Sequence, residues 1–220
     1  MADLARALDA AVDEHRLLEH PFYQAWSEGR LTGEDLAFYS TQYWRQVEAF
    51  PGYLEALAER LPDGDARRIV IENLSDETDG DHPGLWRAFA AALGVENAPL
   101  ESSVAEPETL RCVEVFRTGM QDAAIPFALG MLYGYESQTP AVSTTKVRGL
   151  REHYGIDGGG IEYFELHAEL DVEHAGELAS ALARYTDAPE GRDQATSGAR
   201  VGARAVWRLL DGVARVRAIA

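Results

Sequence analysis

Residues 161–185, IEYFELHAELDVEHAGELASALARY, decide the fold of this 220-residue chain. Apolar residues recur in this stretch at intervals of three and four, which is the spacing of an amphipathic helix. The same spacing recurs along nearly every other segment, and the alternating pattern of half-buried strands is absent. The helical segments are uneven in length and show no internal repeat, which argues against a solenoid. The sequence therefore predicts an all-α chain folded as a single helical bundle.

Prolines and glycines divide the chain into its expected helices. We expect about seven to nine of them, at residues 3–17, 21–28, 32–60, 65–78, 83–93, 108–120, 125–153, 161–185 and 192–217. Pro51 should bend the third of these helices, and Pro140 lies inside the seventh. The segments 95–107 and 155–160 are expected to be loops.

Composition narrows the class of protein. Asp and Glu number 37 against 20 Lys and Arg, a formal net charge of −17, so neither nucleic acid nor anionic lipid is an expected partner. A hydrophobic fraction of 46% is ample for one folded domain over residues 1–220. No apolar run approaches the ~20 residues of a membrane span, and the first residues lack the basic start and apolar stretch of a signal peptide. We therefore expect a cytoplasmic protein.

The chain contains one cysteine and one lysine. Cys112 has no partner for an intramolecular disulfide and lies in an amphipathic segment, so it is expected to be a small buried hydrophobe. Every other basic residue is an arginine, which leaves Lys146 as the single side-chain amine. Of the two residue types, only lysine can lose its proton and become a nucleophile. The alternative interpretation is one residual lysine at the surface.

Three residues in the stretch 161–185 form a candidate metal site. His167, Asp171 and His174 are spaced i, i+4 and i+7, which places them in a narrow arc of one helix face, with Tyr163 one turn earlier. Two imidazoles and a carboxylate on one face suit a transition metal with nitrogen and oxygen ligands. The alternative is an exposed polar stripe on an acidic helix.

Glu136 is the candidate from a facing helix, since a bundle site takes ligands from several helices. It ends the apolar stretch 127–136, FALGMLYGYE, where an ionised carboxylate must be paired or metal-bound. A carboxylate at the solvent edge of a core helix is the other reading. Gly130 and Gly134 weaken this helix unless another element packs closely on it.

The segment 71–83 offers a third source of ligands. Glu77 and His82 are five residues apart, about 140° around an ideal helix, so they share a metal only if the helix breaks at Gly80. The same segment carries an acidic stripe that is most simply a solvated face, made of Glu72, Asp76 and Asp79.

With these residues in view, the chain resembles the haem-oxygenase-like bundles that bind two metals without haem. Within that group it is most similar to the p-aminobenzoate synthases related to the Chlamydia protein associating with death domains. The similarity runs through nearly the whole chain, at 20–26 (HPFYQAW), 48–54 (EAFPGYL), 72–77 (ENLSDE), 82–86 (HPGLW), 135–140 (YESQTP) with Lys146, and the 167–174 pattern.

The resemblance implies six metal ligands, a reaction and the residues that perform it. The ligands carry over onto Glu77, His82, Glu136, His167, Asp171 and His174. The implied metals are an iron pair or an iron–manganese pair that activates O₂ with electrons from an external reductant. In such enzymes p-aminobenzoate, a folate precursor, is made from one of the protein's own tyrosines. Here that role falls to Tyr23, with Lys146 as nitrogen source and Tyr135 and Tyr163 as relays lining the same cavity.

Other functions remain open at this point. A di-metal oxygenase or oxidase of the same fold could act on an external amino acid or fatty acid by N-oxygenation, desaturation or C–C cleavage. Less favoured are a metal-free thiamin-degrading or quinone-forming enzyme, for which Cys112 lies outside the matching motif, and a protein-interaction role. Related bundles often form dimers, and Trp207 in the last helix would serve either a homodimer contact or the core.

Overall fold

The computed structural model describes residues 2–220; Met1, with which the expected domain begins, lies outside them. In the described residues every regular element is a helix and no strand occurs, so the predicted all-α class is confirmed. There are eleven α-helices, α1 (Ala2–Asp13), α2 (Pro21–Ser27), α3 (Gly33–Arg60), α4 (Asp65–Asp79), α5 (His82–Ala92), α6 (Asn97–Ser102), α7 (Pro107–Asp122), α8 (Ile125–Glu136), α9 (Thr139–His153), α10 (Glu162–Ala183) and α11 (Pro189–Arg217), with short 3₁₀ helices η1 (Leu17–Glu19) and η2 (Gly158–Gly160).

Some expected boundaries are wrong. The predicted helix at 125–153 is two helices, because Pro140 has no backbone N–H and its ring crowds the carbonyl of Glu136, four residues earlier. The predicted loop at 95–107 contains α6, whose Leu100 is fully buried and fixes that turn against the core. The first helix ends at Asp13 and is followed by η1, while α3 continues through Pro51 as expected.

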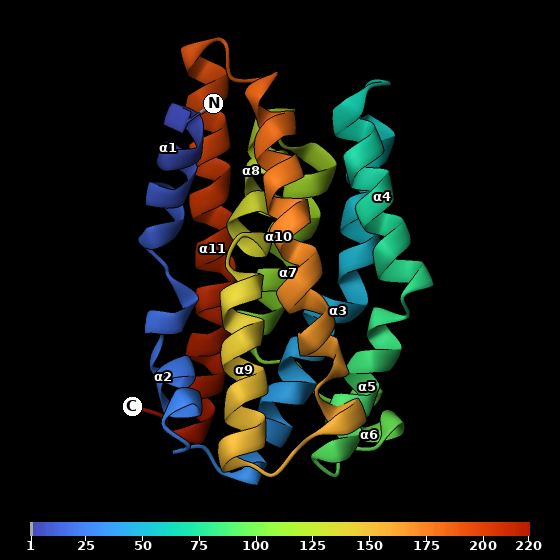
Figure 1. Cartoon of the computed structure of the whole chain (residues 1–220), viewed down its shortest axis with the longest axis vertical. Helices are drawn as coiled ribbons and strands as arrows, with labels where there is room; N and C mark the ends of the chain where they lie inside the picture. Colours follow the sequence, from blue (N-terminus) through green and yellow to red (C-terminus); the bar gives the residue numbers. More distant parts are fainter. Residues whose placement is uncertain (1) are drawn as a thin grey trace.

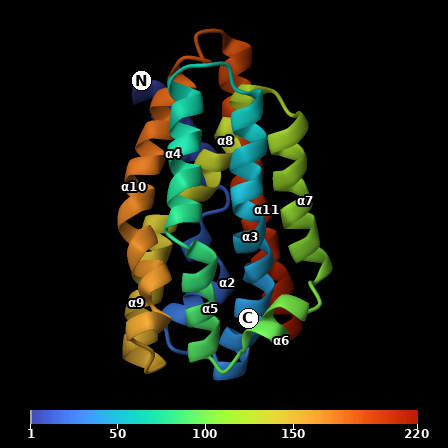
Figure 2. The same ribbon diagram turned by 90° about the vertical axis from the view of Figure 1, so that its right-hand side faces the viewer.

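The long helices run side by side along the length of the bundle (Figure 1). Along one edge, α4 is followed end to end by α5, and Figure 2 shows the same pair from the side, next to α3. The helices α8 and α9 also follow one another, and α10 packs against both of them. Two helix junctions, 80–81 and 137–138, therefore lie near the middle of the bundle, facing the unbroken α10 (Figure 1).

Helices α8 and α11 pack backbone to backbone, and this contact requires glycine. A Cβ added to Gly134 would collide with the backbone carbonyl of Ala199, and one added to Gly198 would collide with that of Phe127. Gly130 meets α11 in the same way. Helix α11 is thus the element that packs closely on Gly130 and Gly134, as expected from the sequence. This contact fixes the position of α8 along the bundle axis, and with it the position of its last residue, Glu136.

The short helix α2 is attached to the bundle by His20. Its Nδ1 accepts a hydrogen bond from the backbone N–H of Phe22, and its Nε2 lies 3.1 Å from Asp211 of α11. This capping places Tyr23 in the core, where it is 1% exposed. Cys112 is buried, as expected. None of the helices in residues 2–220 has the length and apolarity needed to cross a lipid bilayer.

Candidate metal centre

The six predicted metal ligands lie near the middle of the bundle, all buried. The unbroken α10 contributes three of them, and the junctions of the broken helices contribute the others. Glu77 lies in the last turn of α4, His82 is the first residue of α5 and Glu136 is the last residue of α8. The three from α10 are His167, Asp171 and His174.

The break that the sequence required between Glu77 and His82 is present. Helix α4 ends at Asp79, and Asp81 adopts a left-handed conformation, with φ 47°, while its side chain caps α5 by accepting from the N–H of Gly84. Gly80 has to be small, since a Cβ there would lie 2.6 Å from the carbonyl oxygen of Asp76. The turn brings His82 Nδ1 to 2.9 Å from Glu77 Oε2, although the two atoms are not aligned as a hydrogen bond.

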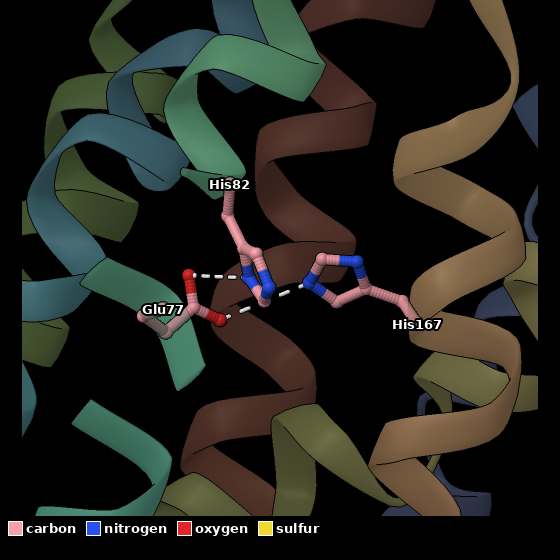
Figure 3. Close-up of side chains that lie close together, drawn as sticks. All are labelled: Glu77, His82 and His167. Carbon is pink, nitrogen blue, oxygen red and sulfur yellow. Dashed lines mark ion pairs between the residues drawn. The ribbon is translucent and has the colours of Figure 1, made fainter. Parts of the chain in front are cut away.

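Glu77, His82 and His167 form a group whose ligand atoms all lie within 4.8 Å of one another (Figure 3). His167 Nδ1 donates to the backbone carbonyl of Tyr163 at 2.7 Å, so Nε2 is the nitrogen that offers a lone pair to a metal ion when the ring is neutral. That nitrogen lies 3.7 Å from Glu77 Oε1. Burial lowers the pKa of His167, but the carboxylates of Glu77 and Asp171 outweigh it and raise that pKa, so the position facing Glu77 favours a positive charge, either a proton or a metal ion.

Glu136, Asp171 and His174 make the other half of the cluster. His174 Nδ1 lies 3.5 Å from Asp171 Oδ1. Burial, and then the charge of Asp171, raise the pKa of Glu136 to about 8. Burial lowers the pKa of His174, but the nearby carboxylates of Asp171, Glu136 and Asp76 outweigh it and raise that pKa to about 9. The raised pKa of His174 reflects the negative charge of this half, whereas that of Glu136 comes first from burial.

The residues present fit a metal cofactor, and Glu77, His82 and His167 are the group whose ligand atoms lie close enough together to hold an ion. Buried atoms without a hydrogen-bond partner include His82 Nδ1, Glu136 Oε2 and His174 Nδ1, which belong to three of the six predicted ligands. Burial raises the pKa of Glu77, but the neighbouring imidazoles of His167 and His82 outweigh it and lower that pKa to about 2, so this carboxylate is ionised. Three carboxylates and three imidazoles are ligands that iron and manganese accept.

Tyr23 and Lys146 meet in a cluster of packed aromatic side chains, which we call the chamber. Lys146, on α9, is 3% exposed, and its Nζ lies 5.3 Å from the ring centroid of Tyr23 and 4.7 Å from that of Phe164. Nζ donates a 2.7 Å hydrogen bond to the hydroxyl oxygen of Tyr39, which lies 3.4 Å from that of Tyr23. Burial lowers the pKa of Lys146 well below its usual range and raises the pKa of Tyr23. The surface alternative for this lysine is therefore wrong.

The predicted relay tyrosines lie between the chamber and the metal cluster. Tyr163 stacks on His167, with ring centroids 4.1 Å apart. The hydroxyl of Tyr43 donates to that of Tyr135 at 3.1 Å, and the ring of Tyr43 lies 5.4 Å from that of Tyr39. Tyr39 and Tyr43 were not singled out in the sequence, where their spacing of four on one face of α3 was the available signal.

Two further residues near the cluster were missed. Asn73 donates to Glu136 Oε1 at 2.7 Å, and Asp76 Oδ2 lies 3.0 Å from His174 Nε2. The spacing of four between Asn73 and Glu77 was the signal for the first. Asp76 was assigned to a solvated stripe; it is half-exposed, yet it contacts the site.

Comparison with known proteins identifies the family. A family model described as an iron-containing redox enzyme matches residues 37–207. The 4-aminobenzoate synthase of Nitrosomonas europaea is 36% identical, over 94% of this chain and 89% of its own length. The 4-aminobenzoate synthase of Chlamydia pneumoniae is also 36% identical, over 96% of this chain and 95% of its own.

The solved structures agree on the fold. A CADD-like protein of Nostoc punctiforme superposes with a TM-score of 0.79 over 100% of both chains, at 18% identity. The family match and the buried Glu77–His82–His167 group together support a metal cofactor. The predicted resemblance is confirmed, and the chain belongs to the haem-oxygenase-like family of iron-containing redox enzymes.

Proposed function

We propose that this protein makes p-aminobenzoate by an oxygen-dependent reaction that consumes its own Tyr23, with Lys146 as the source of nitrogen. The observation that carries the proposal is the chamber itself, in which the only lysine of the chain holds its Nζ 5.3 Å from the ring centroid of Tyr23. Relatives that match almost the whole chain are named 4-aminobenzoate synthases. Tyr23 and Lys146 are too deeply buried to serve a dissolved partner without opening of the bundle.

Comparison of p-aminobenzoate with a tyrosine side chain shows which bonds of Tyr23 must break and form. p-Aminobenzoate is a benzene ring with an amino group opposite a carboxyl group, so the ring and Cβ of Tyr23 are kept and the Cα–Cβ bond is broken. The amino group takes the position of the phenol oxygen. When bound by the six predicted ligands, an iron or iron–manganese pair supplies O₂ activation with electrons from an external reductant.

The chain's own residues supply position and proton control. A nitrogen donor needs a free lone pair, and burial of Lys146 without a carboxylate partner favours the neutral amine. Tyr39 is hydrogen-bonded to Nζ and lies 3.4 Å from the phenol oxygen of Tyr23, so it is placed to move a proton between them. Burial raises the pKa values of Tyr135 and Tyr163, so each stays protonated until it is oxidised.

The test is mass spectrometry on purified protein loaded with Fe(II), with or without Mn(II), and given O₂ and a reductant but no organic substrate. Release of p-aminobenzoate in at most one equivalent, with the mass lost at residue 23, is the expected result. Protein labelled with ¹⁵N only in lysine should yield ¹⁵N product.

Matched variants separate this reaction from chemistry on an external substrate. Tyr23→Phe and Lys146→Arg should yield no product, while Tyr53→Phe, which alters a buried tyrosine hydrogen-bonded to Val113, should react normally. Product from Tyr23→Phe refutes the role of Tyr23. Two-metal protein that turns over only when an amino acid or fatty acid is added would instead indicate an oxygenase with an external substrate.

A further inference from the structure

Two polar side chains on α4 contact predicted metal ligands that come from two other helices. Asn73 Nδ2 donates to Glu136 Oε1, at the end of α8, at 2.7 Å. Asp76 Oδ2 lies 3.0 Å from Nε2 of His174 on α10. Neither is one of the six predicted ligands. We infer that Asn73 and Asp76 are positioning residues, which aim Glu136 and His174 at one ion of the metal pair; this rests on the metal centre of the proposed function.

The contact with Asp76 sets which ring nitrogen of His174 is free. A carboxylate accepts from a ring N–H, so Nε2 is the donor and Nδ1 is the nitrogen left to offer a lone pair to a metal ion when the ring is neutral. Nδ1 is buried, has no hydrogen-bond partner and lies 3.5 Å from Asp171 Oδ1. This is the arrangement of a metal-binding histidine whose outer N–H is held by a carboxylate. Asp76 thus turns the imidazole so that its lone pair faces the inside of the cluster.

The contact with Asn73 performs the same task for Glu136. The amide occupies Oε1, which leaves Oε2 buried without a hydrogen-bond partner. Asn73 is itself 2% exposed, and its own Oδ1 has no partner. A buried amide held this way gains little for the fold, because its carbonyl oxygen is left without a hydrogen bond. Its one strong contact is to the carboxylate, and that contact fixes the direction of the free oxygen.

Both positioning residues lie within one turn of Glu77, so α4 spans the two halves of the cluster. It contributes Glu77 to the group with His82 and His167, and it orients ligands of the half that contains Asp171. Loss of Asn73 or Asp76 should therefore lower the affinity for one metal ion and leave the affinity for the other unchanged.

The experiment is an equilibrium titration with Mn(II), in which electron paramagnetic resonance counts the free ion. The variants are Asp76→Ala, Asp76→Asn and Asn73→Leu. The control is Asp79→Asn, which removes one charge from an exposed position of the same helix. Far-UV circular dichroism checks that each variant is folded.

Wild-type protein and Asp79→Asn should bind two equivalents. In Asp76→Ala and Asn73→Leu the first equivalent should bind as in wild type, while the second should weaken about 10- to 100-fold, the usual cost of losing such a partner. In Asp76→Asn the amide oxygen still accepts from Nε2, so the affinity for the second ion should fall between wild type and Asp76→Ala.

Two equivalents bound with wild-type affinity by folded Asp76→Ala would overturn the inference, as would equal weakening of both ions. Because Asp76 is half-exposed, this variant tests the inference even if Asn73→Leu does not fold. Wild-type protein that holds two ions but releases no p-aminobenzoate would refute the proposed function and leave the positioning role standing.

Discussion

Replacement of Lys146 by methionine should change how the stability of the protein depends on pH. Lys146 is 3% exposed, lies among aromatic rings and has no carboxylate among its neighbours, so its ammonium form is poorly solvated in the folded state. Burial lowers its pKa in the folded protein well below the value of about 10.4 expected in the unfolded chain. Methionine fills a similar volume without a titratable group.

The magnitude follows from proton linkage. Between the folded and unfolded pKa values, the unfolded chain holds one proton at residue 146 that the folded chain does not. The free energy of unfolding therefore rises with pH in this window by about 1.4 kcal/mol per unit. The wild-type free energy of unfolding reaches its full value above the unfolded pKa of Lys146. It falls as the pH drops toward the folded pKa, and below that pKa it no longer changes through this residue. Lys146→Met lacks this contribution, so it should be more stable than wild type at neutral pH.

Two measurements check this reasoning. Urea unfolding of wild type and Lys146→Met between pH 7 and pH 10 should give curves that converge with rising pH at that slope. The control is Arg148→Met, at an exposed position on the same helix. Its free energy of unfolding should depend on pH in the same way as that of wild type. Since the chain has only one lysine, protein labelled with ¹³C at lysine Cε gives a single nuclear magnetic resonance signal. A signal that titrates near pH 10.4 in the folded protein, or parallel stability curves, would refute the argument.

Two further perturbations test the packing and the metal centre. Gly134→Ala should destabilise the protein by about 1–3 kcal/mol in urea unfolding, because the new Cβ meets the backbone of α11. Gly176→Ala, where a Cβ meets nothing within 4 Å, should instead stabilise α10 by roughly 0.5–1 kcal/mol, and similar effects from the two variants would contradict the packing. Chelation of the metals should lower Tm, since an ion present at 100 times its Kd stabilises the native state by about 2.7 kcal/mol. An unchanged Tm after complete metal removal, shown by elemental analysis, would mean that the native state gains nothing from the ions.

The part of the site that was predictable from sequence is the part that one helix fixes. His167, Asp171 and His174 share a face of α10 because an ideal helix sets their angles, and no other element has to be placed first. Glu136 was found from its apolar surroundings. For Glu77 only a condition was predictable, a helix break before His82, because the surrounding structure decides which residue, here Asp81, adopts the left-handed conformation.

The residues that were missed depend on how helices sit against each other. Asn73 reaches Glu136 across 63 positions of sequence, and Asp76 reaches His174 across 98. Such pairs require the relative height of two helices, which spacing within one segment does not contain. For α8 that height is set by the glycine contact with α11, and the length of α8 by the proline at 140. The hydrogen bond from Lys146 to Tyr39 was not predictable for the same reason, since it joins two different helices.

The chamber and the cluster of predicted metal ligands lie apart, and the two sites require opposite electrostatic environments. A pair of metal ions requires carboxylates, whereas an amine beside a carboxylate would be held as ammonium and would have no lone pair. Between them the fold places neutral aromatic groups. On α10, Tyr163 stacks on His167 while the next residue, Phe164, lies 4.7 Å from Lys146 Nζ, so one helix turn borders both sites. Under the proposed function, tyrosines in this layer would carry the oxidation to Tyr23 as a coupled electron and proton, without placing a fixed charge beside Lys146.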